Sequence, residues 1–401
     1  MKPSIETIKQ AAEILKGVTK RTDLIQSPVF SNESGNDIYL KPENLQLTGA
    51  FKIRGAYFKI SRLSSDEKKM GLIASSAGNH AQGVALAAQM QDVKATIVMP
   101  KTTPLIKVEA TKNYGAEVIL KGDCYDDAYQ EARRLEKDQN LVFIHPFDDP
   151  DVMAGQGTIG LEILEELKDV HSILVPIGGG GLIAGIATAV KAINPNVKVI
   201  GVEPDGARAM TDSLFRNKIQ TLEKVNTIAD GVAVKTPGTH TFSVIKDLVD
   251  EIITVTDSEL MESFLLLLER HKLIAENSGV LSLAALNKLK IRGEKIVSVI
   301  SGGNIDVVTI SSMIDRGLVK RGRIFCFSAE MPDEPGQLLK ISTILSEENA
   351  NIIKLDHNQF KTLDRFKQVQ LEVTVETNGH EHVRKIIKAL EEGGYSIERV
   401  Y

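Results

Sequence analysis

Short runs of β-branched and aliphatic residues recur between helix-like stretches from about residue 38 to residue 300. This order predicts an α/β fold in which open, mostly parallel, twisted sheets are covered by helices. Ligands of such sheets lie beyond the carboxyl ends of the strands, so functional residues are expected directly after each run. The clearest runs are residues 95–98, 117–120, 172–175, 198–200 and 296–300.

The pattern changes near residue 316, where a basic stretch punctuated by glycine begins. We place a linker at 316–323, between a first domain at 1–315 and a second at 324–401. The second domain reads as a ferredoxin-like βαββαβ unit, whose sheet edges can bind a small ligand or a second copy. Its predicted elements are a strand at 324–329, a helix at 336–348, strands at 351–357 and 366–375, a helix at 379–391 and a strand at 395–400.

Composition narrows the class of protein. The 401 residues suffice for two to three domains, and 42% hydrophobic with 25% charged residues is typical of globular chains rather than disordered ones. With 48 Lys and Arg against 53 Asp and Glu, the net charge of -5 leaves no broad basic surface for nucleic acid.

Cysteine and histidine positions argue against metal ligation and disulfide bonding. The two cysteines, Cys124 and Cys326, lie far apart, and the eight histidines show no ligand spacing. The amino terminus has no apolar signal segment, and the longest apolar run, 264–268, is too short for a bilayer. We therefore expect a cytoplasmic protein with no metal, no membrane partner and no nucleic-acid partner.

A glycine loop is the strongest local motif. It lies between the predicted strand at 172–175 and a helix that runs to Ile193. Without side chains, successive backbone N–H groups can converge on an anion at the helix start, where the helix dipole also favours negative charge. A plain strand-to-helix turn is the alternative, and anion binding is the favoured interpretation. The loop comprises Gly178, Gly179, Gly180 and Gly181, followed by Leu182.

A second loop follows the apolar run at 72–74 and precedes a helix at 81–90. Its hydroxyls, its amide and its backbone N–H groups can bind a carboxylate, while Asn79 holds a polar ring substituent. A serine-capped turn is the alternative when the loop is taken alone. The loop comprises Ser75, Ser76, Ala77, Gly78, Asn79 and His80.

Two further motifs complete the set of candidates. Lys52 is flanked by Phe51, Ile53 and small residues, so desolvation would lower the pKa of its amine and make it nucleophilic toward a carbonyl. Ser301 opens a Ser-Gly-Gly-Asn turn directly after the run at 296–300. Four motifs at the ends of strands, two of them rich in glycine, predict one shared cleft.

In chain order, these motifs resemble those of the threonine dehydratase and serine racemase family of fold-type II pyridoxal phosphate enzymes. The resemblance covers about residues 5–315. It implies pyridoxal 5′-phosphate as the cofactor and a fold like that of tryptophan synthase β. It also implies a small subdomain at about 46–148 inserted in a larger one at 1–45 and 149–315. The matching segments are 50–56, 76–80, 178–181 and 301–304.

The resemblance assigns roles residue by residue. It implies that Lys52 forms the Schiff base with the cofactor and removes the α-proton, while Phe51 packs on the cofactor ring. It implies that Asn79 contacts the ring hydroxyl and that Ser301 faces the pyridine nitrogen. A neutral hydroxyl at that nitrogen limits delocalisation of charge into the ring and favours expulsion of a β-leaving group. The implied phosphate site is Gly178 to Gly181 with Leu182, and the implied substrate loop is Ser76 to His80.

The implied reaction is the elimination of L-threonine, and of L-serine, to 2-oxobutanoate or pyruvate and ammonia. Ala77 stands where racemases of this family carry an acid/base serine, which favours dehydration over racemisation. Ala209 replaces the last acidic ligand of the divalent cation site that the family has beside the position of Glu203. Ala50 stands where many relatives have serine, so no hydroxyl contributes there.

The tail at 333–338, Asp-Glu-Pro-Gly-Gln-Leu, resembles an ACT domain. That resemblance implies an amino-acid effector at a subunit interface and a homodimer or homotetramer. Two alternatives to the lyase stay open: a serine racemase or another hydroxy-amino-acid lyase, and a non-catalytic amino-acid sensor. The preference between threonine and serine, the effector, and a role in isoleucine biosynthesis or in catabolism are also open.

Overall fold

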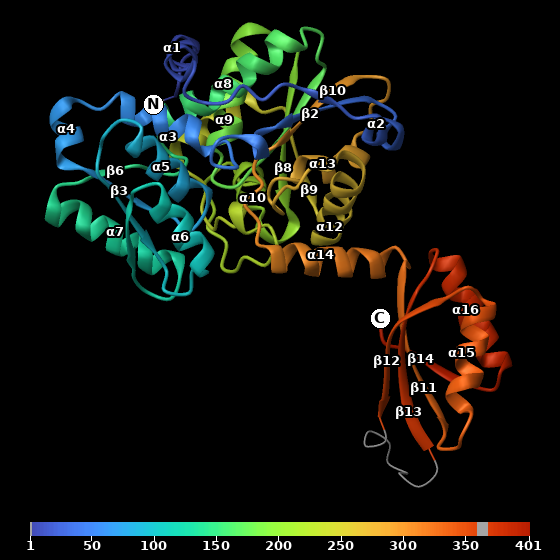
Figure 1. Cartoon of the computed structure of the whole chain (residues 1–401). Coiled ribbons are helices and arrows are strands. Elements are labelled where there is room, and N and C mark those ends of the chain that lie inside the picture. The colour runs from blue at the N-terminus through green and yellow to red at the C-terminus, as the bar shows by residue number, and fades with distance from the viewer. Residues whose placement is uncertain (1, 359–367) are drawn as a thin grey trace. The chain divides into compact units, whose positions relative to one another are not determined.

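The apolar runs of the first three quarters of the chain form two parallel sheets in the computed structural model, which describes residues 2–358 and 368–401 (Figure 1). The larger sheet has the strand order β1-β2-β10-β7-β8-β9, and its neighbours are parallel except for β1 and β2. Every residue of β7 is buried, as expected for a central parallel strand. The strands are β1 Ile25–Gln26, β2 Asp37–Pro42, β7 Ser172–Pro176, β8 Lys198–Pro204, β9 Glu251–Val255 and β10 Lys295–Ile300.

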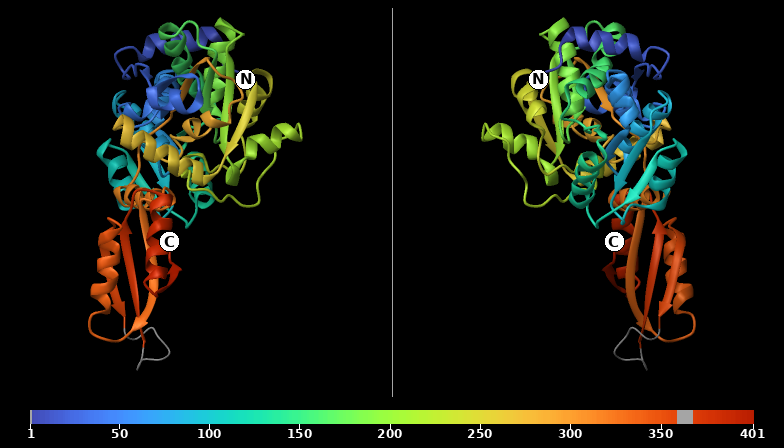
Figure 2. Two further views of the ribbon diagram at one scale, coloured as in Figure 1. Left: turned by 90° about the vertical axis from the view of Figure 1, so that its right-hand side faces the viewer. Right: turned by 90° about the vertical axis from the view of Figure 1, so that its left-hand side faces the viewer.

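The smaller sheet has the order β5-β4-β3-β6 and is parallel throughout. In Figure 2 its cyan and teal strands lie in one part of the first unit, and the green and yellow strands of the larger sheet lie in the other. The strands predicted from apolar runs are confirmed in both sheets. The small sheet consists of β3 Leu72–Ser75, β4 Ala95–Met99, β5 Glu117–Leu120 and β6 Val142–Phe143.

Helices pack on both sheets and enclose separate hydrophobic clusters. Two of them, α8 and α9, approach closely at Gly185, where an added Cβ would lie 2.1 Å from the carbonyl oxygen of Met153. The helices of the first unit are α1 Ile5–Leu15, α2 Pro28–Ser34, α3 Lys52–Ser61, α4 Ser65–Met70, α5 Asn79–Gln89, α6 Leu105–Asn113, α7 Tyr125–Gln139, α8 Pro150–Glu166, α9 Gly181–Ile193, α10 Ala209–Phe215, α11 Thr239–Leu248, α12 Asp257–Leu266 and α13 Leu281–Ala284.

The second compact unit contains the predicted βαββαβ order, which is confirmed. Its antiparallel sheet has the strand order β12-β13-β11-β14, and the two helices α15 and α16 cover one face of it (Figure 1). Positions 366–367, where the third strand was predicted to begin, lie outside the described residues. The elements are β11 Ile324–Pro332, α15 Gln337–Glu347, β12 Asn351–Asn358, β13 Gln368–Glu376, α16 His380–Glu392 and β14 Ser396–Arg399.

The linker predicted at 316–323 is wrong in its first part. The chain divides into Met1–Ile305 and Asp306–Tyr401, and helix α14, Val307–Lys320, runs through the predicted start of the linker. Asp315, Arg316 and Lys320 are exposed while Gly317 is buried, so the charged run is the solvated face of a helix. The break comes at Gly322, which adopts a left-handed backbone with φ of 62°.

Within residues 2–358 and 368–401, no helix is long and apolar enough to cross a membrane. Both cysteines are free, Cys124 at the surface and Cys326 in the interior.

Candidate functional site

Lys52 is the first residue of helix α3, and its amine lies near a backbone carbonyl group and an aromatic ring. Lys52 Nζ donates a hydrogen bond to the carbonyl oxygen of Pro146 at 2.7 Å and lies 5.2 Å from the centroid of the Phe51 ring. Burial lowers the pKa of this amine to about 8, and the nearby Glu276 carboxylate opposes that shift. The predicted apolar setting of Lys52 is therefore present, and the amine is partly neutral near neutral pH.

The segment before Lys52 is fixed to the end of strand β10. The amide of Phe51 donates to the carbonyl oxygen of Ser301 at 3.2 Å, and Ala50 forms an isolated antiparallel bridge with Gly302. The Lys52 motif and the Ser301 motif, about 250 positions apart in the chain, are thus backbone neighbours.

The segment after Lys52 is anchored by a buried ionic cluster. The Arg54 side chain is 1% exposed and donates from Nε to Glu43 Oε2 at 2.8 Å and from Nη2 to Glu162 Oε2 at 2.9 Å. Lys41, fully buried, donates to Glu162 at 2.6 Å. These partners hold the first turn of α3, and with it Lys52, against β2 and α8.

The glycine loop leaves its backbone donors free at the start of α9. Among the described residues, no hydrogen-bond acceptor faces the amides of Gly178 through Leu182. Gly180 has a φ of 94°, and a Cβ on Gly179 would lie 2.3 Å from the Phe147 ring, so side chains are excluded there. Several unbonded N–H groups at a helix start fit a bound phosphate group. Phe147 follows Pro146, so this loop lies beside the contact of Lys52.

The loop at Ser76 to His80 also leads into a helix, α5. The hydroxyl of Ser76 accepts from the amide of Gly78 at 3.2 Å, and the amides of Ala77, Asn79 and His80 have no acceptor among the described residues. Burial lowers the pKa of His80 to about 3, so its ring is neutral. Its Nε2 must donate to the carbonyl oxygen of Ile144 at 2.9 Å, because a carbonyl only accepts.

Asn79 and Ser301 lie at the remaining side of the site. Asn79 Nδ2 donates to Glu276 Oε1 at 2.6 Å, and Asn304 Nδ2 donates to Asn79 Oδ1 at 2.8 Å. Ser301 is 4% exposed, and its hydroxyl lies 3.5 Å from the carbonyl oxygen of Ser278, the outer limit of a hydrogen bond. That hydroxyl is available to a stronger acceptor or donor.

The contacts link all four sequence motifs around Lys52, and the roles assigned to their residues stay predictions. Sequence reasoning missed Pro146, Phe147 and Glu276, and it gave no role to Asn304. Pro146 and Phe147 follow strand β6, so the strand-end argument extends to them. Glu276 stands out only as a carboxylate that directly follows the small and apolar run 273–275.

Glu203 serves a different local purpose. It is 1% exposed and accepts hydrogen bonds from the amides of Met210 at 2.9 Å and Thr211 at 2.8 Å. Burial raises the pKa of its carboxyl to about 7. Glu203 thus accepts the hydrogen bonds of backbone amides in the first turn of α10, which begins at Ala209. The described residues contain no cluster of three or more His, Cys, Asp or Glu that could hold a metal.

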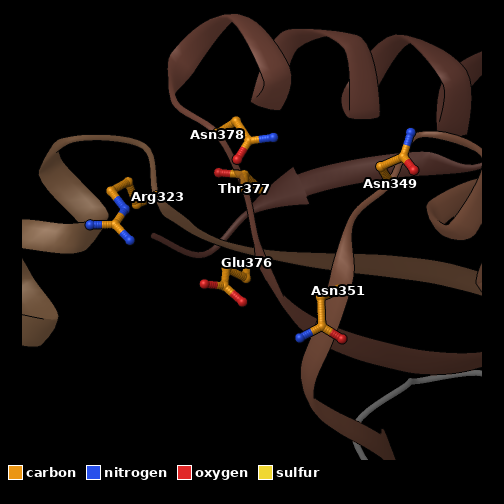
Figure 3. A pocket seen from close by; sticks show the side chains of 6 residues that line it. All are labelled: Arg323, Asn349, Asn351, Glu376, Thr377 and Asn378. Atoms are coloured by element: carbon orange, nitrogen blue, oxygen red, sulfur yellow. The ribbon is translucent and has the colours of Figure 1, made fainter.

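A polar cavity of about 330 Å³ lies in the second unit, at the ends of its strands (Figure 3). The side chains that line it do not converge on one point, and of these residues only Asn351 and Glu376 lie in strands. All of the site residues described above belong to the first unit. The lining residues are Arg323, Asn349, Asn351, Glu376, Thr377 and Asn378.

The first unit thus combines two parallel sheets, unbonded backbone amides at the start of α9 and a desolvated lysine amine. The chain belongs to the pyridoxal-phosphate dependent enzyme family, whose model matches residues 15–302. This membership confirms the predicted cofactor, pyridoxal phosphate, and the predicted fold class with its parallel sheets.

Known proteins similar to the chain carry related names. An L-threonine ammonia-lyase of Thermotoga maritima is 48% identical over 398 residues, 99% of each chain. The processed threonine deaminase isoform 2 of Solanum lycopersicum matches with a TM-score of 0.75 and 40% identity, over 78% of this chain and 95% of that one. Maize serine racemase matches with a TM-score of 0.75 and 35% identity, over 80% of this chain and 100% of that one.

Proposed function

We propose that the chain is a threonine ammonia-lyase, which converts L-threonine to 2-oxobutanoate and ammonia and L-serine to pyruvate and ammonia. The observation that carries this proposal is the amine of Lys52, which bonds the carbonyl oxygen of Pro146, next to Phe147 and the unbonded glycine-loop amides that it contacts. The 48% identity to an L-threonine ammonia-lyase over 99% of both chains supports the choice of substrate.

The residues present fit pyridoxal phosphate. The free amides of Gly178 to Leu182 would hold the phosphate, and Phe51 would pack on the ring beside Lys52. Asn79 would donate to the ring hydroxyl, and Ser301 would face the ring nitrogen. When bound, the cofactor supplies a sink for the electrons released at the substrate α-carbon.

Lys52 acts as the base of the reaction. Its neutral amine accepts the α-proton, and burial keeps a large part of it neutral near pH 8. The carbonyl oxygen of Pro146, which accepts from Lys52 Nζ, holds the amine in position before substrate arrives. The hydroxyl of Ser301 carries no charge, so it does not fix a proton on the ring nitrogen.

The loop from Ser76 to His80 is proposed to bind the substrate carboxylate. The unbonded amides at the start of α5 supply donors and the positive end of a helix dipole. His80 adds no charge to this loop, because its ring is neutral and its Nε2 already donates to the carbonyl oxygen of Ile144.

Racemisation is the second candidate, because maize serine racemase is among the similar structures. It requires a proton donor on the other face of the substrate, and the Ala77 methyl group cannot supply one. Incubation with L-serine separates the two activities. We expect pyruvate with no D-serine, and D-serine formed faster than pyruvate would replace the lyase with a racemase.

We propose that the second unit is an ACT-type regulatory domain that binds an amino acid, and that the chain acts in the cytoplasm as a homodimer or homotetramer. The βαββαβ order supports the domain type. Two free cysteines fit a reducing compartment. Isoleucine and valine are the effectors to test first, by adding each to the threonine assay with the full chain.

A further inference from the structure

Three polar side chains behind the Lys52 site form one continuous chain of hydrogen bonds. Asn304 Nδ2 donates to the carbonyl oxygen of Thr48 at 2.7 Å and to Asn79 Oδ1 at 2.8 Å. Asn79 Nδ2 in turn donates to Glu276 Oε1 at 2.6 Å. The proposed function uses only Asn79 of these three side chains.

The two ends of this chain determine how the Asn79 amide is oriented. A backbone carbonyl only accepts, so Thr48 forces Asn304 to present its NH₂ group. The NH₂ group of Asn304 is a donor, so the oxygen of Asn79 must face Asn304. The carboxylate of Glu276 is an acceptor, so the NH₂ group of Asn79 must face Glu276. A flipped amide would place two acceptors together at Glu276 and two donors together at Asn304.

Two features of the chain allow Glu276 to reach Asn79: the backbone hydrogen bond of Glu276 and the absence of a side chain at Gly302. It is 7% exposed and lies in the irregular segment 272–280, where its amide donates to the carbonyl oxygen of Gly302 at 3.0 Å. A Cβ on Gly302 would lie 2.6 Å from Glu276 Oε1 and 3.0 Å from Asn79 Nδ2. Only glycine at 302 lets the carboxylate reach Asn79.

We propose that Glu276 is a positioning residue, which together with Asn304 holds the Asn79 amide so that an N–H of Nδ2 faces the ring hydroxyl of pyridoxal phosphate. The inference rests on the proposed contact of Asn79 with that hydroxyl. Asn79 Nδ2 has two hydrogens, and the one not bonded to Glu276 is the donor to the cofactor.

The positioning role does not depend on ionisation of Glu276. The charged groups that act on it are Lys52, Lys107 and Asp230, and burial raises the pKa of its carboxyl to about 7. A protonated carboxyl keeps a carbonyl oxygen that accepts from Asn79. A glutamine at this position keeps the same acceptor and nearly the same shape.

The test measures cofactor binding by the full chain freed of cofactor, with two compounds. One is pyridoxal phosphate, and the other is its analogue without the 3-hydroxyl group. The chain contains no tryptophan, so binding is followed by the absorbance of the compound itself. Ratios of dissociation constants are compared between variants, so that the intrinsic difference between the compounds cancels. The variants are E276A, E276Q and N79A, with E203A as a control that removes another buried carboxylate, which lies outside the site.

We expect N79A and E276A to lose about tenfold of the preference for the hydroxylated compound, the usual effect of losing one hydrogen bond. E276Q and E203A should stay within about twofold of the parent ratio, because both keep an acceptor at Asn79. If N79A loses the preference while E276A keeps it, the role of Glu276 is overturned and the proposed function stands. If N79A keeps the preference, Asn79 does not contact the ring hydroxyl, and both that part of the proposed function and the inference are overturned. A merely structural effect of E276A would weaken both compounds equally, which also overturns the inference.

Discussion

At the residue scale, the chemistry depends on one amine in a poorly solvated setting. Burial lowers the pKa of Lys52 to about 8, while the charge of Glu276 acts in the opposite direction. The neutral amine is the nucleophile, so attachment of the cofactor to the free chain should accelerate as the pH rises through about 8 and then level off. The rate is measured from the visible band of the bound cofactor.

The same measurement on Glu276→Gln tests the effect of the Glu276 charge on the pKa of Lys52. Removing the negative charge disfavours the protonated amine, so the midpoint of the pH profile should move below that of the parent chain. A midpoint that moves upward, or a parent profile that still climbs above pH 10 like that of an exposed lysine, would contradict this description of Lys52.

Residues of the site were predictable where a strand ends in a local motif. Asn79 and Ser301 stand in such motifs after β3 and β10, whereas Lys52 was predictable from its apolar and small neighbours. The structure brings the motifs of all three together. Glu276 was not predictable, because its partner Asn79 is 197 positions away and its own segment forms no helix or strand. Only the folded chain shows that this carboxylate meets an amide.

At the element scale, the buried ionic cluster is what holds the first turn of α3. Glu43→Ala removes the partner of Arg54 Nε and leaves the two buried cations Arg54 and Lys41 with one carboxylate, Glu162, between them. This excess buried charge should lower the free energy of unfolding by about 3–5 kcal/mol. Asp138→Ala is the matched control, because it breaks an Arg–Asp pair on α7 that is more than half exposed. Urea denaturation of both variants measures the difference, and equal losses would show that the buried pair has no special role.

The strands were predictable from sequence because their apolar runs are short and lie between helix-like stretches. Helix α14 was not, because glycine and basic residues at 315–323 also occur in linkers. The burial of Gly317 beside an exposed Arg316 distinguishes a packed helix from a linker. This difference follows from packing that the sequence alone does not show.

At the scale of the whole molecule, the family model matches residues 15–302, which lie within the first unit, Met1–Ile305. We therefore expect a chain ending at Ile305 to release 2-oxobutanoate from threonine without response to isoleucine or valine. The full chain should respond to at least one of them, with a change of several-fold in KM or kcat. Identical kinetics in both chains, with and without these amino acids, would remove the regulatory role of the second unit.

The most direct test is the release of 2-oxobutanoate and ammonia from L-threonine by the pyridoxal-phosphate-loaded full chain, beside Lys52→Ala. We expect equal amounts of the two products from the parent chain. Lys52→Ala should release neither product while keeping the thermal unfolding midpoint of the parent. Turnover by Lys52→Ala at the parent rate, or no product from the parent despite a cofactor band that borohydride bleaches, would contradict the assignment of this lysine and this substrate.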